Sequence, residues 1–308
     1  MTLTRRRFHQ LAASTLVTAA AVRSQAQDKA PKARSKGFEV MIGVQSYSFR
    51  DRPLDQAIAA MAELGLATCE LWQGHLEPRL NKPGASDVEK KAFRETLRKW
   101  RLETPVDHFK EIAAKFAQAK VGICAYNYSF KDDFSDEEID RGFVMAQALG
   151  APVITASAQQ DVVPRVAVAA RKHKMLVGMH NHSDIHPNEF ATPADFEKAM
   201  KSQGNGPGRE YIAVNLDIGH FTAANFDAVA FLKKHHKRIV TLHIKDRKRD
   251  QGALTPFGEG DAPIREVLQL LKQRRWKIPA NIEYEYPGAD PVAEVKRCLD
   301  YCRSVLAT

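Results

Sequence analysis

The chain has few cysteines and no long apolar run, and both shortages exclude classes of protein. Its 308 residues include only four cysteines, which lack the spacing of a zinc ribbon. A chain of this length needs no disulfide framework, so Cys69, Cys124, Cys298 and Cys302 are expected to be packing residues. The apolar run from Leu11 to Val22 is too short and too rich in Ala and Thr to span a membrane, so no integral membrane segment is predicted.

Positive charge is in excess but is not concentrated. The formal net charge is +9, from 46 Lys and Arg against 37 Asp and Glu. Arg5, Arg6, Arg7 and Arg23 lie in the first 27 residues, which contain no acid, and removing these four charges leaves +5. No dense Lys/Arg stripe is present, so a nucleic-acid partner is not expected.

The N-terminus has the three parts of an export signal. A basic segment, Thr4–Phe8, precedes the weakly apolar run, and Ser24–Ala26 has the small-x-small pattern of a cleavage site. The paired arginines before Phe8 resemble a twin-arginine export signal, with an ordinary secretory signal or a disordered basic tail as alternatives. We therefore predict a signal peptide over residues 1–27, a disordered linker over 28–38, and a periplasmic location for the mature chain.

From residue 40 onward, short β-branched runs alternate with amphipathic helical patterns. The candidate strands are Met41–Phe49, Ala67–Trp72, Val121–Tyr128, Val153–Ala158, Met175–His182, Ile212–His220, Ile239–Lys245 and Ala280–Tyr286. The segment after the first strand has none of the glycines that a doubly wound nucleotide-binding fold would show there. Eight strands alternating with helices predict an α/β fold, a single-domain (β/α)₈ TIM barrel over residues 39–308.

Polar side chains gather at the ends of these strands, where TIM barrels carry their chemistry. The strand-end residues are Gln45, Tyr47, Glu70, Trp72, Tyr126, Asn127, Thr155, Ser157, His180, His182, Asp217, His220, His243, Lys245, Glu283 and Glu285. Helix-facing positions of the same strands are mostly apolar. The pattern predicts an active site at the mouth of the barrel.

Strands five to eight supply a mixed nitrogen and oxygen ligand set. His180 and His182 end the fifth strand, Asp217 the sixth, His243 the seventh and Glu283 the eighth. A single His at a strand end is usually only hydrogen-bonded, but this set on consecutive strands favours a divalent cation such as Mn²⁺, Mg²⁺, Co²⁺ or Zn²⁺. His180 and His182 point the same way, so spacing leaves open which of them is the ligand.

Four motifs resemble a known family. Asp217–His220 reads Asp-x-Gly-His and His243–Asp246 reads His-x-Lys-Asp, followed by the loop Phe257–Asp261 and by Glu283–Tyr284. These motifs resemble the xylose-isomerase-like TIM barrels, which include sugar phosphate isomerases and epimerases as well as endonuclease IV-type enzymes. The resemblance covers roughly residues 40–305 of the printed sequence, and its motifs are specific to the superfamily rather than to one substrate.

The resemblance implies a metal held by an acid at the end of strand five together with Asp217, His243 and Glu283. This chain departs from the ketose-epimerase pattern, because His180 and His182 stand where those enzymes carry a Glu that is both ligand and base. A metal-bound His cannot also be a free base. The departure therefore disfavours a symmetric epimerisation between two carboxylates.

The remaining candidates contact substrate or move protons. The resemblance implies that His220 contacts a substrate oxygen and that a basic residue after strand seven, Arg249, does likewise. Glu285 lies nearer the rim than Glu283 and is a candidate base. Lys245 either donates to a developing enolate or pairs with a neighbouring acid, Asp246 or Glu283.

Three further residues are candidates for substrate binding. Glu70 enters the barrel mouth beside Trp72 from strand two, with a salt bridge to Lys or Arg as the alternative for Glu70. Glu259 lies in a Gly-Glu-Gly loop that is expected to be a flexible lid or rim.

These features predict an exported, metal-dependent sugar or keto-sugar isomerase or epimerase that works by proton transfer through a metal-stabilised enediolate. The alternatives are a keto-glycoside lyase or hydratase on the same scaffold and a non-catalytic periplasmic sugar-binding protein. An endonuclease IV-like phosphodiesterase needs a three-zinc cluster with more ligands than this barrel mouth offers. The expected partner is a small-molecule sugar, and the oligomeric state is left open, a homodimer included.

Overall fold

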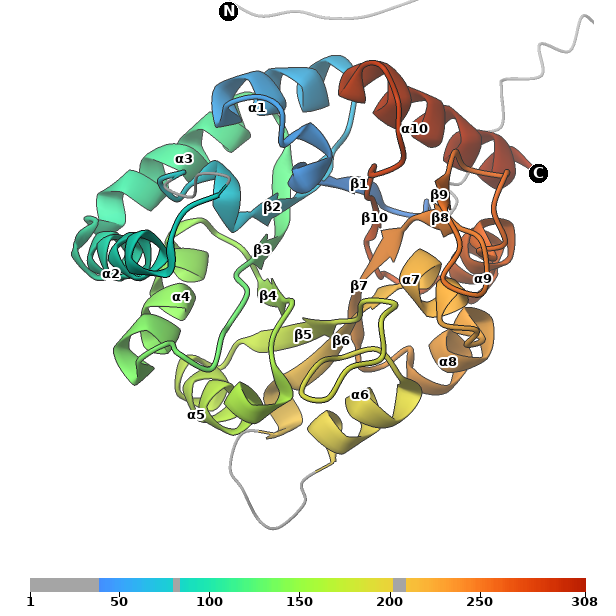
Figure 1. The fold of residues 1–308 in the computed structure, drawn as a ribbon. Coiled ribbons are helices and arrows are strands. Elements are labelled where there is room, and N and C mark those ends of the chain that lie inside the picture. Colours follow the sequence, from blue (N-terminus) through green and yellow to red (C-terminus); the bar gives the residue numbers. More distant parts are fainter. Residues whose placement is uncertain (1–38, 80–83, 202–208) are drawn as a thin grey trace, which may run out of the picture. The chain divides into compact units, whose positions relative to one another are not determined.

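Eight parallel strands close into a barrel in the computed structural model of the chain, which describes residues 39–79, 84–201 and 209–308. The strands follow one another around the barrel in the order β1-β10-β7-β6-β5-β4-β3-β2 (Figure 1). They are β1 (Ile42–Gln45), β2 (Thr68–Trp72), β3 (Gly122–Asn127), β4 (Val153–Ala156), β5 (Leu176–His180), β6 (Ile212–Asp217), β7 (Ile239–Ile244) and β10 (Ala280–Ile282). The predicted TIM barrel is confirmed. The predicted signal peptide and linker lie outside the described residues.

Helices surround the barrel on its outer side (Figure 1). They are α1 (Leu54–Glu63), α2 (Asp87–Glu103), α3 (Val106–Gln118), α4 (Asp136–Ala148), α5 (Val163–His173), α6 (Pro193–Met200), α7 (Ile218–Ala223), α8 (Ala228–His235), α9 (Ile264–Arg274) and α10 (Pro291–Ala307). Short 3₁₀ segments are η1 (Ser46–Phe49), η2 (Gln73–His75), η3 (Gln160–Val162) and η4 (Arg209–Tyr211). None of the helices in the described ranges is long and apolar enough to cross a membrane.

Local capping chemistry sets several helix starts. The Ser135 hydroxyl accepts a hydrogen bond from the backbone N–H of Glu138, and the Glu138 carboxylate accepts one from the backbone N–H of Ser135, which makes the capping box of α4. Thr192 caps α6 in the same way, with Pro193 at the first helical position. Both starts were readable in the sequence because each motif satisfies backbone donors that the helix leaves free.

The sixth strand is shorter than predicted. It ends at Asp217 rather than continuing to His220, because the Asp217 carboxylate accepts a hydrogen bond of 2.7 Å from the backbone N–H of His220 and starts α7. The next helix, α8, begins at Ala228, after a second Asp cap at Asp227. The first strand also stops early, at Gln45, where η1 begins.

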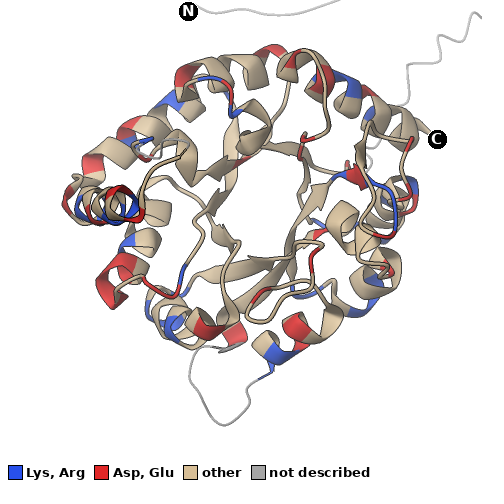
Figure 2. Ribbon diagram, in the orientation of Figure 1, with Lys and Arg blue, Asp and Glu red and all other residues tan. Residues whose placement is uncertain are grey.

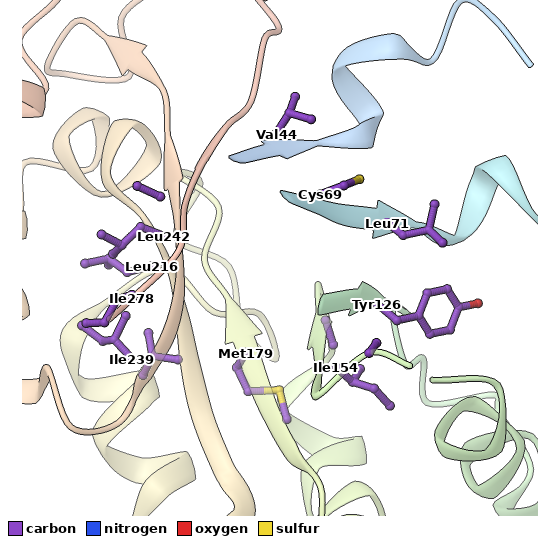
Figure 3. Packing of buried hydrophobic residues seen from close by; sticks show 14 of the residues in the cluster. Val44, Cys69, Leu71, Tyr126, Ile154, Met179, Leu216, Ile239, Leu242 and Ile278 are labelled. Carbon is purple, nitrogen blue, oxygen red and sulfur yellow. The ribbon is translucent and has the colours of Figure 1, made fainter. Parts of the chain in front are cut away.

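The hydrophobic core lies between the barrel strands and the helices. Figure 3 shows Val44, Leu71 and Tyr126 on the helix-facing side of the first three strands, with Leu216 and Leu242 across the barrel. All five side chains are fully buried. The four cysteines are free thiols, and Cys69, Cys298 and Cys302 are buried within this core, as packing residues would be.

Charged residues lie mainly on the outer helices, with both signs interspersed (Figure 2). One network of charged side chains is buried, and it joins α2 to α4. Arg94, Arg98 and Arg101 of α2 approach the Glu138 carboxylate at 2.8, 2.9 and 3.3 Å. Arg101, itself buried, also holds Glu77 at 2.7 Å. This network fastens α2 to α4 on the outside of the barrel.

We expect the free energy of unfolding of Glu138→Gln to depend much less on pH in acid solution than that of the parent protein. Burial opposes the charge of Glu138, but Arg94 and Arg98 outweigh it and lower its pKa to about 2. Since the folded pKa is depressed, the stabilisation is present above the ordinary carboxyl range near pH 4.5 and disappears as the pH falls toward 2. The variant should lose about 2 kcal/mol at pH 7, after allowance for solvent screening of the partly exposed Arg94 and Arg98, and almost nothing near pH 2.

Thermal or urea unfolding at several pH values measures this effect. The control is Glu137→Gln, which removes the neighbouring exposed acid of the same helical turn and should shift stability by less than about 0.5 kcal/mol. Equal losses for the two variants at pH 7 would contradict the assignment of acid stability to Glu138.

A loop after β7 lies over the C-terminal end of the barrel. The small hairpin of β8 (Asp246–Arg247) and β9 (Leu254–Thr255) was not predicted. Buried Asp246 accepts hydrogen bonds from the backbone N–H groups of Gly258, Gly260 and Ala262 at 2.8, 3.0 and 3.1 Å. A Cβ on Gly260 would overlap the Asp246 carboxylate. The Gly-Glu-Gly loop expected to be a flexible lid is therefore fastened to Asp246.

Candidate metal centre and active site

Four predicted ligands meet inside the C-terminal end of the barrel. His180 ends β5, Asp217 ends β6, His243 is in β7 and Glu283 directly follows β10. One ligand atom from each lies within 4.8 Å of the others, and all four residues are buried. The barrel closure brings them to one depth, with Asp217 directly opposite His243 in the β6–β7 pairing.

In each of these four residues, one side-chain atom is buried and makes no hydrogen bond with any residue that the structure describes. These atoms are His180 Nδ1, Asp217 Oδ2, His243 Nδ1 and Glu283 Oε2. Lys245 and His243 Nδ1 lie near the two carboxylate oxygens, but the four atoms converge in one buried cluster, an arrangement that a bound cation would satisfy. Two imidazole nitrogens and two carboxylate oxygens are a donor set that suits a divalent transition metal, and the residues present therefore fit such an ion.

His180 rather than His182 belongs to this cluster. Burial, followed by the nearby His243 and His182, lowers the pKa of His180 well below its usual range, so its imidazole is neutral and able to act as a ligand. His182 lines the cavity next to the cluster, with Nε2 at 3.5 Å from Ser157 Oγ. Of the two histidines, His180 is therefore the one that the structure places in the cluster.

Lys245 neutralises the carboxylates around the cluster. Its Nζ lies 3.1 Å from Asp217 Oδ2, 2.8 Å from Glu283 Oε2 and 2.5 Å from Glu285 Oε2. Burial opposes the ammonium charge, but the three acids outweigh burial and raise the pKa of Lys245. Of the two acids expected as its partners, Lys245 pairs with Glu283, while Asp246 holds the loop.

His220 lies beside the cluster between two cations. Its Nε2 is 3.0 Å from Lys245 Nζ, and its Nδ1 is 3.0 Å from an Arg247 guanidinium nitrogen that also donates to Ser183 Oγ at 2.8 Å. Burial and then Lys245 lower the pKa of His220 well below its ordinary value, so the ring is neutral. Gly219 permits this arrangement, because a Cβ there would meet the Lys245 carbonyl oxygen at 2.7 Å.

A cavity of about 220 Å³ opens above the cluster. Its lining residues come from most strand ends: Gln45, Tyr47, Trp72, Asn127, Ser129, Ser157, His180, His182, His243, Glu283 and Glu285. Trp72 and Tyr47 meet edge to face, with ring centroids 4.9 Å apart. A larger hollow of about 550 Å³ lies outside the barrel between α4 and α5, but it contains none of the predicted site residues.

Three residues that were predicted to bind substrate do not line the cavity. Glu70 is fully buried below the cavity and does not line it. Arg249 is exposed at the turn of the β8–β9 hairpin, with its backbone N–H bound to Asp261 at 2.9 Å. Glu259 pairs with Arg297 at 2.9 Å on the surface. In this structure none of the three side chains reaches the cavity.

Two residues near the site were not identified from the sequence. Arg247, two residues after Lys245, holds the basic position that was expected of Arg249. Ser129 lines the cavity just beyond the end of β3, past the residues that were counted as its strand end. Alternation along the chain could have suggested Arg247, since it shares a face with Lys245.

Several solved structures have a similar fold. The structure is similar to that of the 3-keto-D-glucoside 4-epimerase YcjR from E. coli, with a TM-score of 0.62, 13% sequence identity, and 86% and 100% of the two chains covered. It is equally similar to the IOLI protein with a binding zinc atom, with a TM-score of 0.62, 14% identity, and 87% and 98% coverage. At such identities the likeness shows the fold alone.

The sequence also matches a curated protein over part of its length. The L-ribulose-5-phosphate 3-epimerase UlaE of Escherichia coli is 33% identical over 92 residues, which are 30% of this chain and 32% of that protein. The match thus spans about a third of the length of this curated relative. A family model described as the xylose isomerase-like TIM barrel matches residues 58–305, which contain all four clustered ligands, and the chain belongs to that family.

Proposed function

We propose that the protein is a divalent-metal-dependent isomerase or epimerase acting on a sugar or keto-sugar. The observation that carries the proposal is the cluster of His180, Asp217, His243 and Glu283, each with a buried atom that lacks a hydrogen bond. These four residues would hold the divalent cation, which would supply Lewis-acid polarisation of a substrate carbonyl and so make the neighbouring C–H bond more acidic. The partial match to an L-ribulose-5-phosphate 3-epimerase supports the substrate class.

The chain's own residues supply the remaining steps. Glu285 lines the cavity and is not one of the clustered ligands, so we assign it the removal of the acidified proton. Lys245, held as an ammonium by its three carboxylates, stabilises negative charge that develops on the substrate oxygens. Trp72 and Tyr47 give the opposite wall of the cavity an aromatic surface on which the apolar face of a sugar ring can pack.

The departure at strand five supports one specific alternative. Since His180 occupies the position of a second ligand acid, the cavity carries Glu285 and His182 as chemically different proton-transfer groups. Such a pair suits a reaction in which one group takes a proton and the other protonates a leaving oxygen. Elimination from a keto-glycoside, by a lyase or hydratase, is therefore the second candidate.

Exchange with solvent deuterium tests the proposal against a purely sugar-binding protein. With Mn²⁺ present, the protein should incorporate deuterium from D₂O at the carbon next to the carbonyl of its sugar, as measured by mass spectrometry across a panel of ketoses and keto-glycosides. A binder would shift in thermal stability with the same sugars but leave every C–H bond unexchanged. Sugar binding without exchange across the panel would overturn the catalytic proposal.

We further propose export by the twin-arginine route to the periplasm. The proposal rests on the paired arginines before Phe8, the apolar run and the small-x-small site, all of which lie outside the described residues. Replacing Arg5, Arg6 and Arg7 with Lys should keep the full-length precursor in the cytoplasm. Fractionation followed by N-terminal sequencing of the exported chain checks both the route and the cleavage site.

A further inference from the structure

Glu70 is a buried carboxylate in the interior of the barrel, one layer below the metal cluster. Its exposed fraction is 0%, and β2 places it among the side chains that fill the barrel. The hydrogen bonds found for it come from amide, hydroxyl and imidazole groups rather than from the Lys or Arg that the sequence suggested as an alternative. A buried carboxylate is costly unless its oxygens are well satisfied, so these partners decide its role.

Five neutral or imidazole groups surround the Glu70 carboxylate. Oε1 accepts from Gln45 Nε2 at 2.8 Å, from Thr155 Oγ1 at 2.7 Å and from Asn215 Nδ2 at 3.3 Å. Oε2 accepts from Asn281 Nδ2 at 3.2 Å. The fifth group is His243, whose Nε2 lies 2.9 Å from Oε1. These contacts place hydrogen-bond donors on both oxygens of the buried carboxylate.

His243 presents opposite ring nitrogens to Glu70 and to the metal cluster. Its Nδ1 lies 2.9 Å from Glu283 Oε2 and 3.8 Å from Asp217 Oδ2. Its Nε2 faces Glu70. Oε1 already accepts hydrogen bonds from Gln45 and Thr155, so the contact of 2.9 Å is a hydrogen bond when the ring carries its proton on Nε2. A neutral imidazole that carries its proton on Nε2 has its lone pair on Nδ1, and that lone pair points at the cluster.

Asn215 completes the polar layer around His243 Nε2. Its Nδ2 lies 3.0 Å from Nε2 and 3.3 Å from the Glu70 oxygen that Nε2 approaches, so both donors can share that oxygen. Because Glu283 Oε2 lies 2.9 Å from Nδ1, a proton on Nδ1 would be held by Glu283, whereas a cation bound at Nδ1 would leave the ring proton on Nε2, facing Glu70. Barrels of this type usually fill such a layer with branched apolar side chains, so a polar one here has a purpose beyond packing.

We infer that Glu70 is a positioning residue for the metal centre: its carboxylate holds His243 as the Nε2–H tautomer, with Nδ1 turned toward His180, Asp217 and Glu283. Glu70 itself touches neither the cation nor the substrate. The inference rests on the proposed function for the identity of the site. Hydrogen-bonded carboxylates behind a ligating His orient the ring and raise its basicity, and their loss typically weakens metal binding by about 10–100-fold.

The tautomer can be read in the unaltered protein. In Zn²⁺-loaded protein labelled with ¹⁵N-histidine, NMR should show the shift of a protonated nitrogen at Nε2 of His243 and of a metal-bound nitrogen at Nδ1. The signal is assigned by its absence from His243→Gln. The opposite tautomer, or an equal mixture of the two, would overturn the inference whether or not the protein is an isomerase.

Metal affinity is the second readout and needs no substrate. Isothermal titration with Mn²⁺ alone should give a dissociation constant about 10–100-fold higher for Glu70→Gln than for the parent protein. The control is Thr241→Val, which removes a buried hydroxyl without a hydrogen-bond partner on the same strand as His243 and should leave Mn²⁺ binding unchanged. Circular dichroism establishes that both variants are folded.

The outcomes separate the two proposals. Tight Mn²⁺ binding by both the parent and a folded Glu70→Gln would overturn the positioning role and leave the proposed function intact. If Glu70→Gln does not fold, the tautomer of the parent protein still decides the question. Weakened Mn²⁺ binding together with the Nε2–H tautomer supports the inference, even if no sugar in the panel shows exchange.

Discussion

Asp217→Asn should reduce kcat/KM by about 10³-fold or more. The substitution keeps the size of the side chain and the cap of α7, since Asn is as good an N-cap as Asp. It removes one of the two anionic oxygens of the proposed ligand set. Metal polarisation contributes several kcal/mol to such reactions, and about 4 kcal/mol corresponds to roughly 10³ in rate. Steady-state kinetics and metal content after dialysis measure the two effects.

Asp227→Asn is a matched control for this experiment. Asp227 caps α8 through the N–H three residues later, as Asp217 caps α7, but it lies on the exposed side of the barrel. It should retain parental turnover and metal content. Full activity of Asp217→Asn, or of the parent protein stripped of metal by a chelator, would contradict a metal-dependent reaction at this cluster.

Glu285→Gln should lower kcat by about 10²–10³-fold while metal binding stays within a few-fold of the parent. Glu285 lines the cavity, is 23% exposed and is not one of the four clustered ligands. Loss of a general base typically costs about 10²–10⁴ in rate. Because glutamine keeps the shape and can still accept a hydrogen bond from Lys245, the loss should fall on kcat rather than on KM.

Glu197→Gln controls for the loss of a carboxylate paired with an ammonium group. Glu197 lies 2.6 Å from Lys234 Nζ on the outside of the barrel, much as Glu285 lies 2.5 Å from Lys245. Its replacement should leave kcat unchanged. If Glu285→Gln also retained full activity and full deuterium exchange, another cavity group would have to take the proton, and His182 is the group placed to do so.

The barrel could be predicted from the sequence because its signals are local. Each strand is a short β-branched run, and several helices begin at caps such as Ser135 and Thr192 that the neighbouring residues complete. The candidate ligands followed from the fold, because parallel strands of a closed barrel bring their C-terminal ends to one side. The metal cluster therefore has the strand-end residues that were expected for it.

The sequence did not show how deep in the barrel each strand residue lies or at which residue each strand ends. Tyr126 and Asn127 both looked like strand-end groups, but alternation allows only one to face inward: Asn127 lines the cavity, while Tyr126 packs toward Met145 of α4. Glu70 looked like a mouth residue, since the sequence does not show how far up the barrel wall a strand position lies.

The turn after β7 explains the remaining error. Arg249 was expected at the site, but the chain reverses at Asp250 and Gln251, which both have positive φ, and carries Arg249 outward. Arg247 precedes the reversal and so stays beside His220. A two-residue strand and a tight reversal leave too weak a pattern to be read among other polar residues.

The two halves of the barrel divide the site between them. All four clustered ligands come from β5 and later, whereas the aromatic and neutral polar wall of the cavity comes from β1 to β4. A chimera could therefore exchange the first half for that of a relative to change which sugar is accepted, and keep the inherited metal centre. The requirement is a carboxylate at the position of Glu70, because that single side chain from the first half fixes the tautomer of a ligand in the second.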